Sequence, residues 1–217
     1  MKLDPSKSIL YLITRGETTE VTTADSLEFK EIIEQVSAAV SAGIDFVQLR
    51  EKRLSARTLF ELTLQAGAVV QGSTTRVLVN DRADIAAGAG AAGVHLTTRS
   101  IDSKTIRRTC GDDFVIGIST HSLEEAHLAK EGAADFIVFG PVFATSSKPE
   151  YTPVGLAELS NVTRELDDFP VLALGGVTRQ NLADCLRAGA QGVAGISLFR
   201  EPQTLMSIIT QVKQGVA

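Results

Sequence analysis

Short apolar segments alternate with polar clusters along this chain, and this recurrence limits its possible folds more than any other feature. Continuous apolar runs are typical of strands that are buried on both faces of a parallel sheet. The polar clusters follow the runs, so they would gather at one end of such a sheet, where α/β folds carry their chemistry. The candidate strands are 9–14, 44–49, 76–79, 93–96, 114–118, 136–139, 171–174 and 193–196.

Stretches of helical length separate these segments. In Leu27–Ala42 and Thr58–Val70 one helical face is apolar and the opposite face carries charges, and Pro202–Gly215 would be a closing helix. Strand–helix alternation repeated through the 217 residues predicts an α/β fold, a single (β/α)8 TIM barrel. A doubly wound open sheet is the alternative.

Glycines mark three expected helix ends. Gly43, Gly132 and Gly189 each follow a helical stretch, and we expect them in the left-handed cap conformation that glycine adopts at least cost. The surrounding segments resemble one another and suggest one repeated helix-to-strand joint. These segments are 42–47, 131–136 and 188–193.

Hydroxyl residues mark two expected helix starts. Ser122 with Glu125 matches a capping box, in which the hydroxyl and the carboxylate bind backbone N–H groups of the first turn. Thr178 is the expected N-cap of a helix over Arg179–Ala188.

The composition narrows the class of protein. No linker or compositional shift divides the chain, so one domain over residues 1–217 is expected. The net charge of −5 and the lack of a basic stripe argue against nucleic acid as a partner. No apolar run approaches membrane-spanning length and residues 1–7 lack a signal-peptide core, so we expect a cytoplasmic protein. Cys110 and Cys185 lack metal-ligand spacing and are expected as reduced residues on helices.

Three polar residues, Gln48, Arg50 and Lys52, alternate where the second apolar run ends. Alternate residues of an extended strand point to the same side. Two cations and an amide in this position suit a phosphate-bearing anion. A solvated charged loop is the alternative, because Glu51 and Arg53 interrupt the pattern.

Asn80 and Asp81 directly follow the third run. A carboxylate at a strand end beside a phosphate site commonly anchors Mg²⁺. Either residue could instead be the N-cap of a helix over Asp84–Ala89. The sequence leaves both roles open.

Two histidines lie near the expected functional end. His95 lies within a candidate strand and is interpreted as a core residue. His121 follows the next strand together with Ser119, and it could hydrogen-bond a diphosphate or transfer a proton.

Three later loops supply further polar groups. The stretch Gly140–Val154 is the longest after any candidate strand, and it could wrap a phosphate, close as a lid or be a flexible solvated loop. The loops after the last two strands of such barrels often bind phosphate through backbone N–H groups, and paired glycine permits close approach or a tight turn. The residues concerned are Thr145, Ser147, Lys148, Gly175, Gly176, Ile196 and Ser197.

The order of these motifs is similar to that of one enzyme family. The chain resembles the thiamine-phosphate synthases (thiamine phosphate pyrophosphorylases), to which thiazole tautomerases are related, over nearly its whole length. The stretches that carry the resemblance are Tyr11–Thr14, Gln48–Lys52, Asn80–Arg82, Gly93–Leu96, Ser119–His121, Gly140–Phe143, Thr145–Lys148, Gly175–Thr178 and Gly195–Ser197.

The resemblance implies a transferase that joins a hydroxymethylpyrimidine diphosphate to a thiazole phosphate and releases diphosphate, with Mg²⁺ as cofactor. It implies a pyrimidine cation that the thiazole nitrogen captures, while Arg50, Lys52 and Lys148 stabilise the leaving diphosphate. The residues implied for the pyrimidine diphosphate are Gln48, Arg50, Lys52, Asn80, Ser119 and Lys148. Those implied for the thiazole phosphate are Thr145, Ser147, Gly176, Ile196 and Ser197, with Gly175 as a further expected substrate-binding residue, and Asp81 is the implied Mg²⁺ ligand.

The chain departs from the family pattern in two places. Ser100 stands where the family usually has a second acidic Mg²⁺ ligand, and Arg15 directly follows Thr14 where the family often has Asp-Arg. Asp81 alone could suffice, because Mg²⁺ keeps waters and binds phosphate oxygens. Arg99 or Asp102 could compensate.

Two alternative functions therefore stay open. A thiazole tautomerase would use His121 as acid and base and would need no diphosphate metal. The missing carboxylate favours the tautomerase. The residues that favour the synthase, because they could hold a diphosphate, are Gln48, Lys52, Asn80, Asp81 and Lys148. A non-catalytic barrel that binds thiamine phosphate is the third hypothesis. Small molecules, rather than nucleic acid or membranes, are the expected partners, and the sequence leaves a homo-oligomer open.

Overall fold

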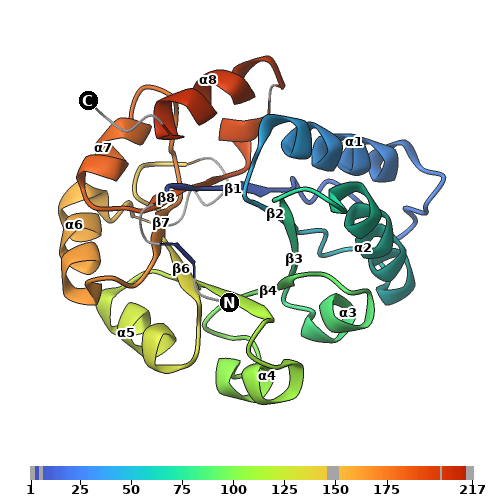
Figure 1. The fold of residues 1–217 in the computed structure, drawn as a ribbon, viewed down its shortest axis with the longest axis horizontal. Coiled ribbons are helices and arrows are strands. Elements are labelled where there is room, and N and C mark those ends of the chain that lie inside the picture. Colours follow the sequence, from blue (N-terminus) through green and yellow to red (C-terminus); the bar gives the residue numbers. More distant parts are fainter. Residues whose placement is uncertain (1–2, 5–6, 146–151, 201, 214–217) are drawn as a thin grey trace.

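The computed structural model describes residues 3–4, 7–145, 152–200 and 202–213. Strands and helices alternate throughout this part of the chain (Figure 1). In chain order they are β1 (Ile9–Ile13), α1 (Leu27–Ala42), β2 (Phe46–Leu49), α2 (Ala56–Val70), β3 (Arg76–Asn80), α3 (Ala83–Gly88), β4 (Gly93–Leu96), α4 (Ser103–Cys110), β5 (Val115–Thr120), α5 (Leu123–Glu131), β6 (Phe136–Phe139), α6 (Gly155–Leu166), β7 (Val171–Ala173), α7 (Leu182–Arg187), β8 (Gly192–Gly195), the 3₁₀ turn η1 (Ser197–Phe199) and α8 (Pro202–Lys213).

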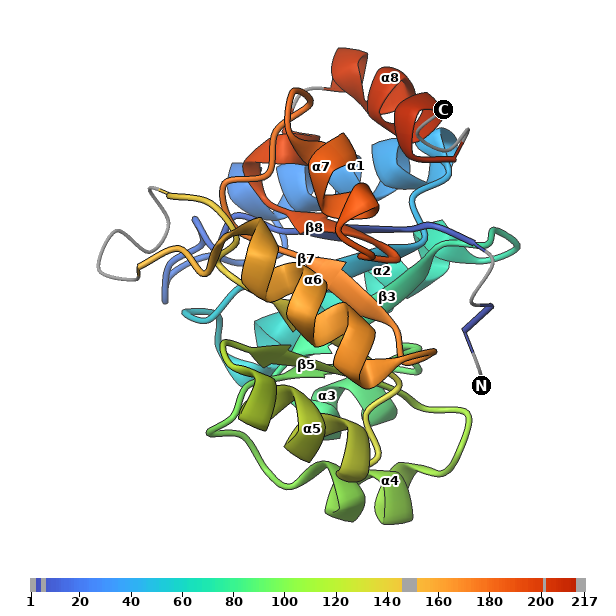
Figure 2. The same cartoon turned by 90° about the vertical axis from the view of Figure 1, so that its left-hand side faces the viewer.

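The eight strands form a closed parallel barrel in the order β1 to β8. β1 pairs with β2 on one side and with β8 on the other, where Tyr11 lies opposite Ala194. The helices form a ring around the strands (Figure 1), and Figure 2 shows α5 and α6 lying against the outside of the sheet. The predicted (β/α)8 barrel is confirmed, and the β1–β8 pairing excludes the open sheet. Within the described residues, no helix has the length and hydropathy needed to cross a bilayer.

The barrel interior is filled by large side chains that point inward from alternate strand positions. Tyr11, Phe46 and Phe136 are buried and meet there, with ring centroids 5.5–5.8 Å apart. The Tyr11 ring meets the other two edge to face, an arrangement that aromatic pairs prefer. This packing closes the centre of the barrel, so chemistry is confined to its ends.

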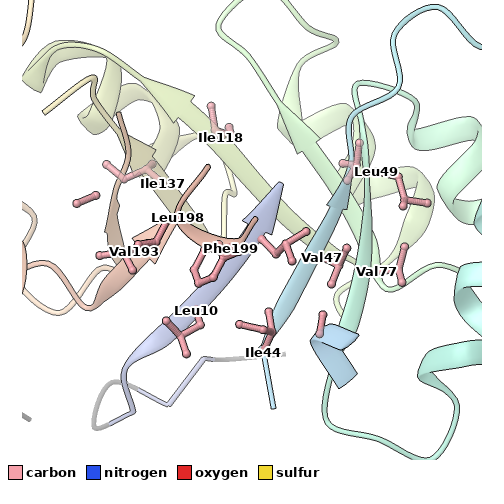
Figure 3. Packing of buried hydrophobic residues seen from close by; sticks show 14 of the residues in the cluster. Leu10, Ile44, Val47, Leu49, Val77, Ile118, Ile137, Val193, Leu198 and Phe199 are labelled. Carbon is pink, nitrogen blue, oxygen red and sulfur yellow. The ribbon is translucent and has the colours of Figure 1, made fainter. Parts of the chain in front are cut away.

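The second apolar layer lies between the strands and the helices. The intervening strand residues, including Leu10, Val47 and Val193, form one continuous cluster with apolar helix side chains. Figure 3 shows these three residues together with Leu198 and Phe199 of η1. Burial on both faces explains why the strands read as uninterrupted apolar runs.

Aspartates secure two of the repeated helix-to-strand joints. The Asp45 carboxylate accepts a hydrogen bond from the Leu10 N–H (2.9 Å), and Asp135 accepts one from the Ile116 N–H (2.7 Å). Each carboxylate thus fixes the strand that precedes its own in the barrel. Burial raises the pKa of Asp45 above its ordinary value, while the Leu10 N–H and the charge of Lys213 act in the opposite direction. At the amino end of the barrel, these two carboxylates therefore serve to hold neighbouring strands together.

The predicted glycine caps are confirmed at two positions and wrong at one. Gly43 and Gly189 have φ angles of 75° and 94°. Gly132 instead continues the right-handed conformation, and Ala133 takes the positive φ of 88°. Gly132 is needed for a different reason, because an added Cβ would lie 2.7 Å from Ser103 Oγ, which donates to the Gly132 carbonyl.

One predicted N-cap and one alternative N-cap are wrong. Thr178 is not an N-cap, because α7 begins at Leu182 after Asn181, whose side-chain oxygen accepts from the Thr178 N–H (2.7 Å). The helix expected over Asp84–Ala89 is α3, which starts after Arg82 without a side-chain cap. Asn80 and Asp81 therefore do not cap it.

The start of α5 is as expected, with one change. Ser122 Oγ accepts from the Glu125 N–H (3.2 Å), so Ser122 is the N-cap. The Glu125 carboxylate accepts from the N–H of His121 (2.7 Å), one residue earlier than a capping box requires. This contact holds the backbone of His121 at the end of β5.

Candidate active site at the barrel mouth

The carboxyl ends of β1 to β8 and the loops that follow them form one end of the barrel, here called the mouth. Gln48 at the end of β2 is 1% exposed, and its Nε2 donates to Asn80 Oδ1 on β3 (3.1 Å). Asn80 is paired in register with His95 on β4. The inward-pointing amides of two neighbouring strands are therefore held together beside a histidine.

His95 continues this polar line to β5. Its Nε2 lies 2.8 Å from Ser119 Oγ, and its ring lies 5.5 Å from that of Tyr11 in the barrel interior. The interpretation of His95 as a buried residue is right, but its contact with a predicted substrate-binding serine was missed. Burial, and then the charge of Arg50, lower the pKa of His95 to about 3, so its ring is neutral. The line Gln48–Asn80–His95–Ser119 crosses four consecutive strands.

The lowered pKa of His95 predicts a specific loss of stability in acid. The unfolded histidine binds a proton below pH 6.5, whereas the folded one does so only near pH 3, so stability falls as the pH falls through this window. This group alone should remove about 2 kcal/mol of unfolding free energy between pH 7 and pH 5. Urea titrations at both pH values should show this difference in the wild-type chain and not in His95→Gln. An equal pH dependence in the two proteins would contradict the assignment.

The prediction that Gln48, Arg50 and Lys52 alternate to the same side of a strand holds as far as Arg50 and does not extend to Lys52. Arg50 is half-buried and its N–H donates to Thr14 Oγ1 (2.8 Å), while its charge acts on His95 inside the barrel. β2 ends at Leu49, so strict alternation does not extend to Lys52, whose side chain is exposed. The alternative of a solvated charged loop is wrong for Glu51, which is 3% exposed.

Asp81 presents one carboxylate at the mouth. It has a φ of 60°, its N–H donates to the His95 carbonyl (2.9 Å), and its side chain is exposed. Ser100 Oγ accepts from the N–H of Thr97 (2.8 Å), and Asp102 is the N-cap of α4, accepting from the Thr105 N–H (3.0 Å). In the part of the chain that the structure describes, no three His, Cys, Asp or Glu side chains are grouped to hold a metal.

The loops after β6 and β7 form the opposite side of the mouth. The Phe143 N–H donates to the Gly175 carbonyl (3.0 Å), and a Cβ on Gly176 would lie 2.4 Å from the Ala144 carbonyl oxygen. Paired glycine is therefore required by the approach of two protein loops. Thr145 lies at the end of the described part of this loop, and Ser147 and Lys148 lie outside the described residues.

Hydrogen bonds hold both the backbone and the ring of His121, the backbone N–H through the Glu125 carboxylate and the ring through a backbone carbonyl. Its Nδ1 is hydrogen-bonded to the Gly140 carbonyl, which can only accept, so Nδ1 carries a proton. In the neutral ring Nε2 is then the basic nitrogen. Ile196 packs against the inner apolar cluster after β8, and Ser197 begins η1 with an exposed side chain.

A cavity of about 270 Å³ lies beside the mouth, on the outer side of β1. The residues predicted to bind substrate do not line it. Its lining residues are Leu12, Arg15, Glu17, Thr18, Glu28, Glu31, Ile32, Glu34, Gln35, Ala38, Glu51, Phe199, Arg200 and Leu205. We place the candidate site at the mouth, because the hydrogen-bonded polar groups converge there and the cavity is bounded by helix faces.

Known proteins resemble the chain over most of its length. Residues 10–199 match the family model described as thiamine monophosphate synthase. The thiamine-phosphate synthase of Alkaliphilus oremlandii is 31% identical over 196 residues, which cover 90% of this chain and 93% of that relative. The thiamine-phosphate synthase of Roseiflexus castenholzii is 34% identical over 201 residues, covering 90% and 88%.

A solved structure agrees with these relatives. The thiamine phosphate pyrophosphorylase from Pyrococcus furiosus superimposes with a TM-score of 0.79 at 26% identity, covering 96% of this chain and 98% of that one. The family model, which matches residues 10–199, covers every strand of the barrel except the first residue of β1. It therefore includes all the groups that meet at the mouth. The chain belongs to the thiamine monophosphate synthase family.

Proposed function

We propose that the chain is a thiamine-phosphate synthase, a transferase that joins a pyrimidine diphosphate to a thiazole phosphate and releases diphosphate. The observation that carries the proposal is the polar line across β2 to β5, which consists of two hydrogen-bonded pairs, Gln48 with Asn80 and His95 with Ser119. The two pairs are neighbours because Asn80 and His95 lie opposite each other in register. Arg50 adds a cation at the same end. Amides and a hydroxyl suit a pyrimidine, and the cation suits its diphosphate.

The proposed roles divide between the two sides of the mouth. The pyrimidine diphosphate would contact residues at or just after the carboxyl ends of β2, β3 and β5, and the thiazole phosphate would contact the loops after β6, β7 and β8. The first group comprises Gln48, Arg50, Lys52, Asn80 and Ser119, joined by Lys148 from the β6 loop. The second group comprises Thr145, Ser147, Gly175, Gly176, Ile196 and Ser197.

This arrangement fits a dissociative substitution. The bond between the pyrimidine methylene carbon and the diphosphate oxygen breaks, and both of its electrons leave with the diphosphate. Arg50 and Lys52 would stabilise the negative charge that grows on the leaving group. The thiazole nitrogen then donates its lone pair to the methylene cation. The main task of the protein is therefore to hold the two substrates close together in the correct orientation.

Mg²⁺ fits this mouth as an ion carried by the substrate. Asp81 offers one exposed carboxylate, and Mg²⁺ commonly binds one or two carboxylates together with phosphate oxygens and water. When bound, it would neutralise part of the diphosphate charge. Asp81 would hold the ion through its carboxylate. The hydrogen bond from the Asp81 N–H to the His95 carbonyl fixes the backbone of Asp81.

A second carboxylate should strengthen the metal site. Ser100 lies in the β4–α4 loop with its hydroxyl bound to Thr97, so Ser100→Asp adds a charge without removing a buried contact. We expect the half-saturating Mg²⁺ concentration for turnover to fall by about tenfold, since each added carboxylate ligand tightens such a site. Ser73→Asp, in the exposed turn before β3 at the opposite end, is the control. An unchanged Mg²⁺ dependence would show that Ser100 does not face the ion.

The experiment that tests the proposal combines both substrates with the purified chain. Pyrimidine diphosphate, thiazole phosphate and Mg²⁺ should give thiamine phosphate and diphosphate in equal amounts, followed by fluorescence of the oxidised product and by a diphosphate assay. An authentic synthase is the positive control. No product at high protein concentration would reject the synthase.

The contact of His121 with Gly140 favours thiazole tautomerisation as a second candidate. With Nδ1 protonated, Nε2 could accept a proton from the thiazole ring and return it elsewhere. Deuterium exchange into the thiazole phosphate alone, lost in His121→Ala, would support this activity. Tight binding of thiamine phosphate with neither activity would leave a binding protein.

A further inference from the structure

The carboxylate of Glu51 is the most thoroughly bound acidic group of the mouth among those the structure describes. It is 3% exposed and accepts from Thr14 Oγ1 (2.6 Å), Gly16 N (3.0 Å), Thr18 Oγ1 (2.7 Å) and Thr18 N (3.4 Å). All these donors come from the end of β1 and the loop after it. Glu51 therefore ties the loop after β2 to the loop after β1.

Thr14 connects this carboxylate to the backbone of Arg50. Its hydroxyl donates to Glu51 and accepts from the Arg50 N–H (2.8 Å), and Thr14 is fully buried. Because the hydroxyl has one proton, the bond to Glu51 directs its lone pairs toward Arg50. Hydrogen bonds therefore link the Glu51 carboxylate, through the Thr14 hydroxyl, to the backbone N–H of Arg50.

Gly16 packs closely against the carbonyl group of the same residue, Arg50. It has a φ of 73°, and a Cβ at this position would lie 3.0 Å from the Arg50 carbonyl oxygen. The Gly16 N–H is itself bound to Glu51. Both the N–H and the carbonyl of Arg50 are therefore packed against groups that Glu51 holds.

We propose that Glu51 is a positioning residue, which orients Arg50 toward the diphosphate by organising Thr14 and Gly16 around its backbone. The proposal rests on the proposed function, because it gives Arg50 the diphosphate as its ligand. A carboxylate accepts from several donors at once, whereas an amide offers one accepting oxygen. Glu51→Gln keeps the volume but turns an NH₂ group toward donors, which loosens the loop that carries Arg50.

The test is a double-mutant cycle on diphosphate affinity, measured by calorimetry with inorganic diphosphate and Mg²⁺. We expect Glu51→Gln to weaken binding by about tenfold in the wild-type background and by less than about twofold in Arg50→Ala, since coupled residues are not additive. Glu17→Gln, an exposed carboxylate of the β1–α1 loop, is the matched control and should bind as the wild type does.

Thr14→Val removes the connecting hydroxyl while leaving Glu51 in place, and it serves if Glu51→Gln does not fold. It should weaken diphosphate binding in the same way. Equal losses of affinity in both backgrounds, or wild-type affinity in either single variant, would overturn the positioning role alone. A wild-type chain that does not bind diphosphate would overturn the proposed anion site and this inference with it.

Discussion

Replacing Arg50 by alanine is expected to lower kcat for thiamine phosphate formation by about 100- to 1000-fold, the usual loss when one group that stabilises developing charge is removed. The half-buried guanidinium lies at the end of the polar line, where its charge reaches the buried ring of His95. Because the guanidinium is half-buried, water screens its charge less than that of an exposed cation. The initial rate of product formation at saturating concentrations of both substrates measures the effect.

Arg53→Ala is the matched control for this variant. Arg53 follows β2 in the same loop, but its side chain is exposed, and removing it should change kcat by less than about threefold because exposed charges are screened. Similar losses in the two variants would mean that general positive charge, rather than the placement of Arg50, supports the reaction. Full activity of Arg50→Ala would remove it from the proposed mechanism.

Replacing Arg107 by methionine should cost about 3 kcal/mol of unfolding free energy, the low end of the range for breaking a buried ion pair by removing one partner, because this pair is partly buried. Arg107 and Asp135 are each 17% exposed and lie 2.8 Å apart. The guanidinium also donates to the carbonyls of Asp112, Phe114 and Ala133, among others. It thus joins the end of α4 to the starts of β5 and β6.

Urea denaturation followed by circular dichroism measures this loss. Arg108→Met is the control, because Arg108 is the next residue of α4 and its side chain is exposed. That change should stay within about 0.5 kcal/mol of the wild type. If the two variants were equally stable, the Arg107 contacts would contribute nothing net to the barrel. Because these contacts lie at the amino end, kcat of the folded Arg107→Met protein should match that of the wild type.

The barrel was predictable because its strands are buried on both faces and its helices on one. Continuous apolar runs such as Val77–Val79 differ clearly from the amphipathic pattern of Leu27–Ala42. Helix ends were harder to predict, since their residues serve more than one purpose. Gly132 has the composition of a cap but is needed for contact with Ser103, and Asn181 takes the place expected for Thr178.

The site was predictable where side chains follow strand alternation and hidden where they depend on a distant loop. Gln48, Asn80 and Ser119 lie where the strand ends indicate. Glu51 reads as a solvated charge between two cations, because its partners are 33–37 residues away in sequence. Likewise, nothing in the local sequence of His95 identifies Ser119 as its neighbour. The spaced hydroxyls of Thr14 and Thr18 were the available sign that a buried acceptor faces the β1 loop.

The most direct test of the account is a crystal structure of the chain with thiamine phosphate, diphosphate and Mg²⁺. We predict the pyrimidine ring beside Gln48 and Ser119 and the diphosphate within hydrogen-bond distance of the Arg50 guanidinium. Ligand bound in the cavity on the outer side of β1, with no ligand at the mouth, would contradict the central claim that these side chains form the active site.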